Sequence, residues 1–269
     1  MERKLSYTFA AVFAVSLLSS PASAQDSTVW DWGVELYGWL PDIEGTAANG
    51  AEIDLPIDDI LDNLDFTLQG TVFATRGDWS IFADAVYLDL GASEGTKTSR
   101  PIGRFGRVDI GVDADVDLTT FISTVGGGYR FHQSKSTDLN VIGGLRYAYM
   151  DVEIDADVDG NAEVEILGRE FSREFKRSLD LDESETNWDA IIGLQGTTKI
   201  NENWSLLYYG DIGTGDSDYT WQIAAGVSYA FENFDVTLRY RHMEYQFDDN
   251  SAIDELTISG PQIGVRFKF

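Results

Sequence analysis

The chain has 269 residues, with 46 Asp and Glu against 19 Lys and Arg, a formal net charge of -27 and no cysteine. Its apolar share of 43% is typical of folded proteins and excludes wholesale disorder. The lack of cysteine excludes disulfides and thiolate metal sites, and the strong negative charge argues against a nucleic-acid partner because it repels phosphate.

The start of the chain predicts a secretory signal peptide. A short basic stretch precedes an apolar run at 7–18, which is too short to span a membrane. An Ala-Ser-Ala cleavage site follows at 22–24. We therefore expect a signal peptide at 1–24 and one barrel domain at 25–269.

The rest of the chain alternates with period two. Segments of about ten residues carry an apolar or aromatic residue at every second position. This pattern predicts an all-β fold, a single antiparallel up-and-down transmembrane β-barrel, with apolar side chains toward lipid and polar or small ones toward the lumen. We expect about 10 strands, at about 30–40, 66–75, 79–90, 118–131, 139–150, 188–200, 204–213, 219–231, 234–245 and 256–269.

Counts of 8 or 12 strands also fit, because 107–117 and 151–166 alternate as well. We interpret these two segments as strands that project beyond the membrane. The connections after the second, fourth, sixth and eighth strands are short, and most of the others are longer and acidic, with 214–218 as the exception. Short periplasmic turns and long external loops are typical of bacterial outer-membrane barrels.

Aromatic residues stand at both ends of the expected strands, where rings favour the lipid headgroup level. This pattern predicts a barrel exterior in contact with outer-membrane lipid and lipopolysaccharide, and we expect a monomer. The expected aromatic girdle comprises Trp79, Trp188, Trp204, Trp221, Tyr129 and Tyr229.

The last strand carries a resemblance to known proteins. Ile263, Val265, Phe267 and Phe269 resemble the C-terminal signal of Gram-negative outer-membrane barrels, which implies the barrel-assembly machinery as a partner. Residues 34–41, 60–66 and 85–90 resemble a family of small, largely uncharacterised outer-membrane barrel proteins. The resemblance implies a porin-like fold in the Gram-negative cell envelope, and it brings no catalytic motif.

Charged residues fall on the inward positions of the expected strands. A barrel of eight to ten strands is only wide enough to be filled by side chains, so charges inside it must pair. We favour a salt-bridged lumen over a narrow pore for small solutes or ions. The expected lumen charge network comprises Glu35, Asp84, Arg130, Arg146, Asp189, Lys199, Asp211, Asp235, Arg239, Arg241 and Arg266.

The expected outer loops are acidic. Residues 42–65 contain no basic residue, and 56–64 predict a short amphipathic helix with Pro and Asp at its start. Alternating carboxylates suit Ca²⁺ or Mg²⁺, but they match no calcium-loop spacing, so we favour a solvated anionic face and expect no cofactor. The candidate metal ligands are Asp113, Asp115, Asp117, Asp155, Asp157 and Asp159.

The chain has two histidines, and neither stands in a catalytic pattern. His132 falls near an expected periplasmic turn, and His242 falls on a lipid-facing position without a serine nucleophile beside it. We therefore disfavour an outer-membrane hydrolase. The expectation is a non-enzymatic structural or surface-interaction barrel with acidic external loops.

Overall fold

The computed structural model of the chain describes residues 29–48, 50, 52–102, 106–166, 169–247, 251 and 253–269. Side chains are described at all of these positions except 47, 92–116, 152, 154 and 156–183. The predicted signal peptide at 1–24 lies outside the described residues. No helix among the described residues is long and apolar enough to cross a membrane.

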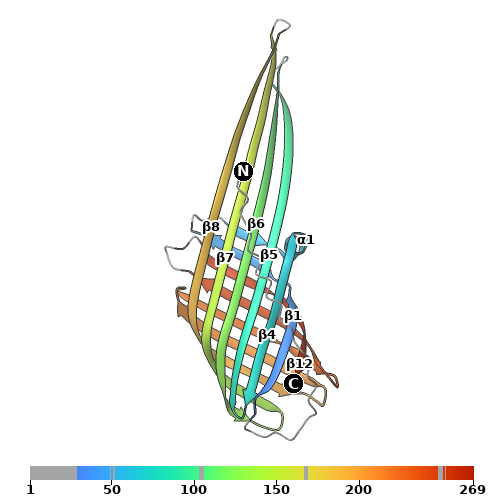
Figure 1. The fold of residues 1–269 in the computed structure, drawn as a ribbon, viewed down its shortest axis with the longest axis vertical. Helices are drawn as coiled ribbons and strands as arrows, with labels where there is room; N and C mark the ends of the chain where they lie inside the picture. Colours follow the sequence, from blue (N-terminus) through green and yellow to red (C-terminus); the bar gives the residue numbers. More distant parts are fainter. Residues whose placement is uncertain are drawn as a thin grey trace.

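Ten antiparallel strands close into a barrel (Figure 1). Each strand pairs with the next barrel strand along the chain, and β1 closes the ring against β12, with Val34 opposite Phe267. This confirms the predicted up-and-down barrel and its strand count. The barrel strands are β1 (Asp31–Trp39), β4 (Leu64–Arg76), β5 (Trp79–Ile102), β6 (Gly106–Gln133), β7 (Thr137–Ile166), β8 (Arg169–Lys199), β9 (Trp204–Gly215), β10 (Tyr219–Ala230), β11 (Asp235–Gln246) and β12 (Ile253–Lys268).

Four of the strands continue far beyond the others. β5 to β8 have 24 to 31 residues, whereas β9 to β11 have 12 each, and Figure 1 shows the four running out together from one end of the barrel. The projecting strands predicted at 107–117 and 151–166 are confirmed. Residues 91–102 and 169–187 were expected as loops and are strands as well. Pairing in register with β6 and β7 satisfies their backbone groups, which local alternation did not reveal.

A small hairpin and a helix cover the same end of the barrel. β2 (Asp42–Ala47) pairs with the start of β12, and β3 (Glu52–Leu55) pairs with β2. The helix α1 (Ile57–Asp62) follows Pro56 and carries acidic residues in its first turn, which confirms the predicted helix. The two short strands were expected as part of a loop.

The inward side chains in the projecting half of the barrel pack into an apolar core. Residues from β1, β5, β6, β7, β11 and β12 meet there, and Ile43 of β2 and Ile60 of α1 close the core from the end. These elements therefore fill this half of the lumen with side chains. The core comprises Tyr37, Trp39, Ile43, Ile60, Val86, Leu88, Leu90, Ile122, Ala148, Met150, Met243, Tyr245, Phe247, Leu256 and Ile258.

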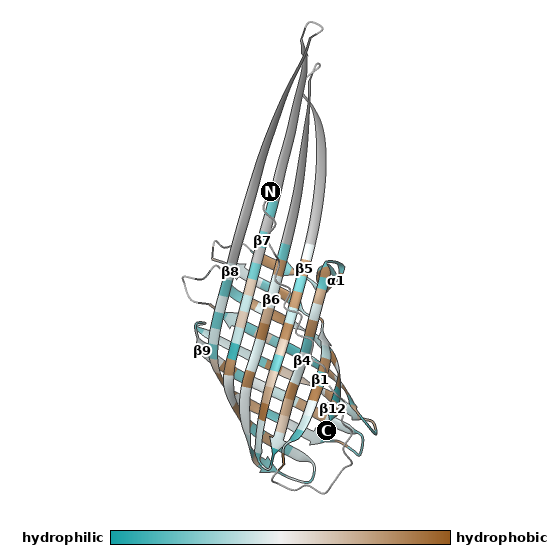
Figure 2. Cartoon of the chain, in the orientation of Figure 1, coloured by the Kyte–Doolittle hydropathy of each residue, from teal (hydrophilic) through white to brown (hydrophobic). Residues whose placement is uncertain are grey.

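The outer wall is apolar where the strands form the barrel. Figure 2 shows hydrophobic residues recurring along the strands of the wall, as expected when every second side chain faces outward. Exposed large residues include Leu68, Leu145, Ile192 and Ile212, which are 53 to 65% exposed. A monomer in water would rarely expose such a continuous apolar face, but lipid covers it in a membrane.

Candidate functional site in the lumen

Aromatic rings pair on the outer wall at both ends of the barrel. At the end with the short turns, Trp79 packs against Tyr129 and Trp204 against Tyr229, each with ring centroids 5.0 Å apart. At the other end, Trp188 packs against Tyr147 at 4.7 Å and Trp221 against the His242 ring at 4.8 Å.

The distance between the two levels is close to the height of the apolar band of an outer-membrane barrel, which is about 25 Å. Trp221 and Tyr229 stand eight positions apart on β10, which is about 26 Å along a strand and about 20 Å along the axis of a barrel whose strands tilt by about 40°. An apolar band between two aromatic girdles is the exterior of an outer-membrane barrel. The protein is therefore a transmembrane β-barrel of the bacterial outer membrane. Because such barrels have short turns in the periplasm and long connections outside the cell, we assign the short turns to the periplasm and the projecting strands to the exterior.

The middle of the lumen holds three groups of charged side chains. In the first, Glu35 is 2% exposed and accepts hydrogen bonds from two arginines. Arg239 Nη2 donates to both carboxylate oxygens at 2.7 Å, and Arg266 donates through Nε at 3.0 Å and Nη2 at 2.6 Å. The Thr237 hydroxyl donates a further bond at 2.7 Å. A Cβ at Gly264 would lie 2.8 Å from this hydroxyl, so the strand needs glycine there.

The second group spans the lumen from β11 to β5 and centres on Arg241. Its Nη1 donates to Asp84 Oδ1 and to the Tyr37 hydroxyl, each at 3.3 Å, and its Nη2 donates to Gln222 Oε1 at 2.9 Å. The Tyr37 hydroxyl in turn donates to Asp84 Oδ2 at 2.7 Å. The guanidinium also lies 4.5 Å from the ring centroid of Trp39, which is a cation–π contact.

The third group is fully enclosed. Arg146 is 0% exposed and donates to Asp211 at 2.5 Å, to Thr220 at 3.2 Å and to Thr124 at 3.4 Å. Asp189 is opposite Arg146 in the strand register, but its oxygens accept from the backbone N–H and the hydroxyl of Ser217 at 3.0 and 2.9 Å. This carboxylate therefore holds the short β9–β10 connection.

Three charged residues assigned to the lumen network lie instead at the periplasmic ends of their strands. Arg130 binds Asp78 of the β4–β5 turn through Nη2 at 2.8 Å, Asp235 accepts from Lys268 at 2.7 Å, and Lys199 is exposed. Alternation predicts the inward face correctly for these residues. It does not say how far each lies from the rim, and this distance decides whether a charge is enclosed or solvated.

Sequence reasoning did not include the neutral members of these groups. Tyr37, Gln222, Thr237 and Trp39 carry no charge, so a search for charged pairs passed over them. Tyr37 and Gln222 were recognisable as inward positions next to charged ones. Trp39 was recognisable in the same way, because the inward alternation through Glu35 and Tyr37 continues to the last residue of β1.

Part of the periplasmic half of the lumen is open. A cavity of about 270 Å³ lies between the charged groups and the periplasmic turns. Phe73, Phe82 and Leu207 contribute apolar walls, and Glu35, Arg239 and Arg241 are among the residues at its inner end. It extends to Thr75 and Ser80, next to the β4–β5 turn.

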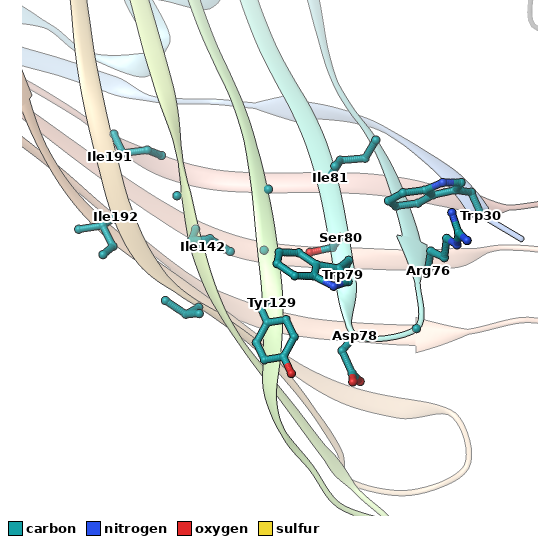
Figure 3. A pocket seen from close by; sticks show the side chains of 15 residues that line it. Trp30, Arg76, Asp78, Trp79, Ser80, Ile81, Tyr129, Ile142, Ile191 and Ile192 are labelled. Atoms are coloured by element: carbon teal, nitrogen blue, oxygen red, sulfur yellow. The ribbon is translucent and has the colours of Figure 1, made fainter. Parts of the chain in front are cut away.

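A larger hollow lies on the outside of the wall and is open to its surroundings. Figure 3 shows Trp79, Ile81, Tyr129 and Ile192 around it, and its volume is about 980 Å³. Two glycines that face each other on β6 and β7, Gly127 and Gly143, form part of its floor. Lipid contacts this part of the wall in a membrane, so the hollow lies apart from the enclosed charges.

The candidate metal ligands lie on neighbouring strands. The register sets Asp113 opposite Asp157 and Asp115 opposite Asp155, while Asp159 is opposite Gly111 and Asp117 opposite Glu153. The side chains of Asp113, Asp115, Asp157 and Asp159 lie outside the described ones, and those of Asp117 and Asp155 are exposed. Among the side chains that the structure describes, no group of three or more His, Asp or Glu could hold a metal ion. Metal binding at these strands stays a prediction.

The C-terminal signal residues lie on the outward face of the last strand. Ile263 and Phe269 are exposed on the wall, and the ring of Phe267 lies 6.2 Å from that of Phe234. The backbone N–H of Phe269 donates to the carbonyl of Trp32 at 2.8 Å, which joins the last residue to β1. Val265 stands opposite Leu36 of β1.

No family model and no curated protein matches the chain. Solved structures with a similar shape include the translocator domain of the autotransporter NalP from Neisseria meningitidis, with 14% identity, a TM-score of 0.43, and coverage of 89% of this chain and 88% of that one. The outer membrane protease OmpT from Escherichia coli has 12% identity, a TM-score of 0.39, and coverage of 93% and 100%. Ail, the attachment invasion locus protein of Yersinia pestis, has 10% identity, a TM-score of 0.31, and coverage of 89% and 98%.

Proposed function

We propose that this protein is a non-enzymatic outer-membrane barrel with a closed lumen, which acts at the cell surface through its extracellular strands. The observation that carries the proposal is the apolar core in the extracellular half of the lumen. Its members are at most 8% exposed, and Ile43 and Ile60 extend it into the elements that cover the barrel end. A continuous aqueous path would have to displace this packed core, which is as costly as opening a protein interior.

The enclosed charges support the same proposal. Arg146 and Glu35 are at most 2% exposed, and each is bound to opposite charges on neighbouring strands of the lumen wall. Charges that set selectivity in a pore face the ions that pass them. These charges face one another, as expected for a lumen that braces the barrel.

The surroundings of the histidines support a role without catalysis. His242 lies on the lipid-facing wall, against the ring of Trp221 and 3.9 Å from Glu244. His132 is exposed near the periplasmic end of β6. Neither histidine lines the lumen cavity.

The extracellular strands support a surface role. β5 to β8 carry their pairing on to Ile102 opposite Gly106 and Ile166 opposite Arg169. A sheet this long extends beyond the lipid headgroups and presents its tips to the outside of the cell. A barrel that only braced the membrane would not need it.

Two measurements test the proposal. The refolded chain in a planar bilayer should give no discrete conductance steps, while its heat-modifiable gel mobility shows that it is folded. Reproducible single-channel steps would overturn the closed lumen and favour the narrow pore.

The second measurement addresses the surface role. In a shortened variant, a tight turn replaces 92–116 and a second one replaces 156–179, because Gly91 stands opposite Asp117 and Asp155 opposite Asp180. Cells that display the full chain should adhere to immobilised extracellular-matrix protein or to one another, and cells with the shortened barrel should not. Equal adhesion with both barrels folded in the outer membrane would contradict a role for the extracellular strands.

A further inference from the structure

The lumen cavity is closed on one side and open on the other. Its inner end is formed by the groups around Glu35 and Arg241, and the apolar core lies beyond them toward the cell exterior. Its periplasmic end reaches Thr75, Ser80 and Asn140, close to the short turns. The cavity is therefore a cup whose mouth faces the periplasm.

Arginines outnumber carboxylates among the residues that line this cup. Arg239, Arg241 and Arg266 line it together with only two carboxylates, those of Glu35 and Asp84. Glu35 is shared between two of the arginines, and Asp84 is bound by the third. Among the residues that line the cup one positive charge is left over, because the carboxylate that balances it within the lumen, Asp189, lies outside the lining and binds Ser217. In surroundings of low dielectric this local excess attracts an anion more strongly than it would in water.

Two of these arginines also have unused hydrogen-bond donors. Nε of Arg239 and Nε of Arg241 are buried and have no hydrogen-bond partner among the described residues. The Arg241 side chain is only 5% exposed. These two Nε atoms are enclosed, so the cup is reached by the exposed parts of the other donors. The Arg239 and Arg266 side chains are 18 and 19% exposed, and an acceptor that enters the cup can receive a charge-assisted hydrogen bond from them.

The side walls of the cup favour an apolar group on any anion that enters it. Phe73, Phe82 and Leu207 give the cup an apolar surface, and Ala224 leaves room beside Arg241. The cup has a volume of about 270 Å³, which is the volume that about nine molecules occupy in liquid water. A cup of this size suits a compact molecule that is larger than an inorganic ion.

We propose that this cup binds a small organic anion from the periplasm, with its carboxylate on the arginines and its apolar or aromatic body against the phenylalanine walls. The inference goes beyond the proposed surface function and does not depend on it. Because the extracellular half is filled, the cup is a binding site and no part of a passage through the membrane.

The test uses benzoate as the probe, since it has about as many heavy atoms as the cup holds waters. The refolded full barrel in detergent micelles is titrated by calorimetry with benzoate and with the neutral analogue benzyl alcohol. We expect saturable binding of benzoate and binding of the alcohol that is at least about tenfold weaker, because only the carboxylate balances the charge of the arginines and accepts charge-assisted hydrogen bonds from them.

Two variants on neighbouring positions of β10 locate the site. Ala224→Leu fills the cup without removing any ion pair, and it should weaken benzoate binding at least about tenfold. Ala225→Leu adds the same atoms on the outer wall, and it should leave the affinity within about twofold. Leu207→Trp is a second filling variant in case Ala224→Leu does not fold, as judged by heat-modifiable mobility.

Three outcomes would overturn the proposal. The first is no saturable binding of benzoate to the folded barrel. The second is equal binding of benzyl alcohol, which would mean that the arginines play no part and the probe enters the micelle or an apolar surface. The third is equal weakening by Ala224→Leu and Ala225→Leu, which would place the site outside the cup.

Discussion

Replacement of Glu35 by glutamine tests how far the enclosed charges stabilise the barrel. The substitution keeps the size of the side chain and removes the one carboxylate that Arg239 and Arg266 share. Removal of one partner from a buried ion pair costs about 3 to 5 kcal/mol, because the remaining charge stays buried without compensation. The two arginine side chains are 18 and 19% exposed and border the cavity, so they can be partly hydrated, and we expect a loss of about 3 kcal/mol in the free energy of unfolding.

A matched control exists at the periplasmic rim. Asp235→Asn removes the carboxylate partner of Lys268, whose side chain is 62% exposed, and should cost at most about 1 kcal/mol. Urea unfolding of the refolded barrels in phospholipid vesicles, followed by tryptophan fluorescence, measures both values. Adding Arg266→Gln to Glu35→Gln should recover part of the loss, since it removes one of the stranded charges. If the two single variants lose equal stability, or if the double variant only adds a further loss, the reasoning on buried pairing is wrong.

Three further predictions concern other parts of the barrel. A Cβ at Gly144 would lie 2.3 Å from a backbone oxygen of β6, whereas one at Gly143 would meet nothing closer than 3.7 Å, so Gly144→Ala should lower the free energy of unfolding by about 1 to 3 kcal/mol and Gly143→Ala should not. Ile60→Ala should cost about 2 kcal/mol, or more, in the same assay because Ile60 is 3% exposed on the core, while Leu61→Ala, at a residue 47% exposed, should cost less than about 0.5 kcal/mol. Phe269→Ala should reduce the amount of heat-modifiable barrel in the outer membrane of cells while the purified chain refolds normally in detergent; normal assembly in cells would refute the proposed assembly signal.

Most of the barrel was predictable because a strand that spans a lipid bilayer leaves a local trace. Lipid on one side and the lumen on the other force a change of polarity at every residue, as from Trp79 through Ser80 to Ile81. The extensions of β5 and β8 were missed because residues 91–102 and 169–187 alternate less regularly than 107–117 and 151–166, which they pair with. Their pairing with β6 and β7 depends on register across strands, and single-segment patterns do not contain it.

The sequence alone determined the fold class and the side of the wall on which a charge such as Arg146 or Asp211 lies, because these follow from alternation along one strand. It favoured ten strands but left eight and twelve open, and the pairing of β1 with β12 decided the count. Only the tertiary structure decided which charges meet. Glu35 and Arg266 come from opposite ends of the chain and become neighbours because β1 and β12 close the ring. Asp189 and Arg146 are paired in register yet bind different partners, since side-chain reach and the β9–β10 connection choose among the available contacts. The cup is likewise a property of closure, because a cavity exists only where ten strands leave a volume that their inward side chains do not fill.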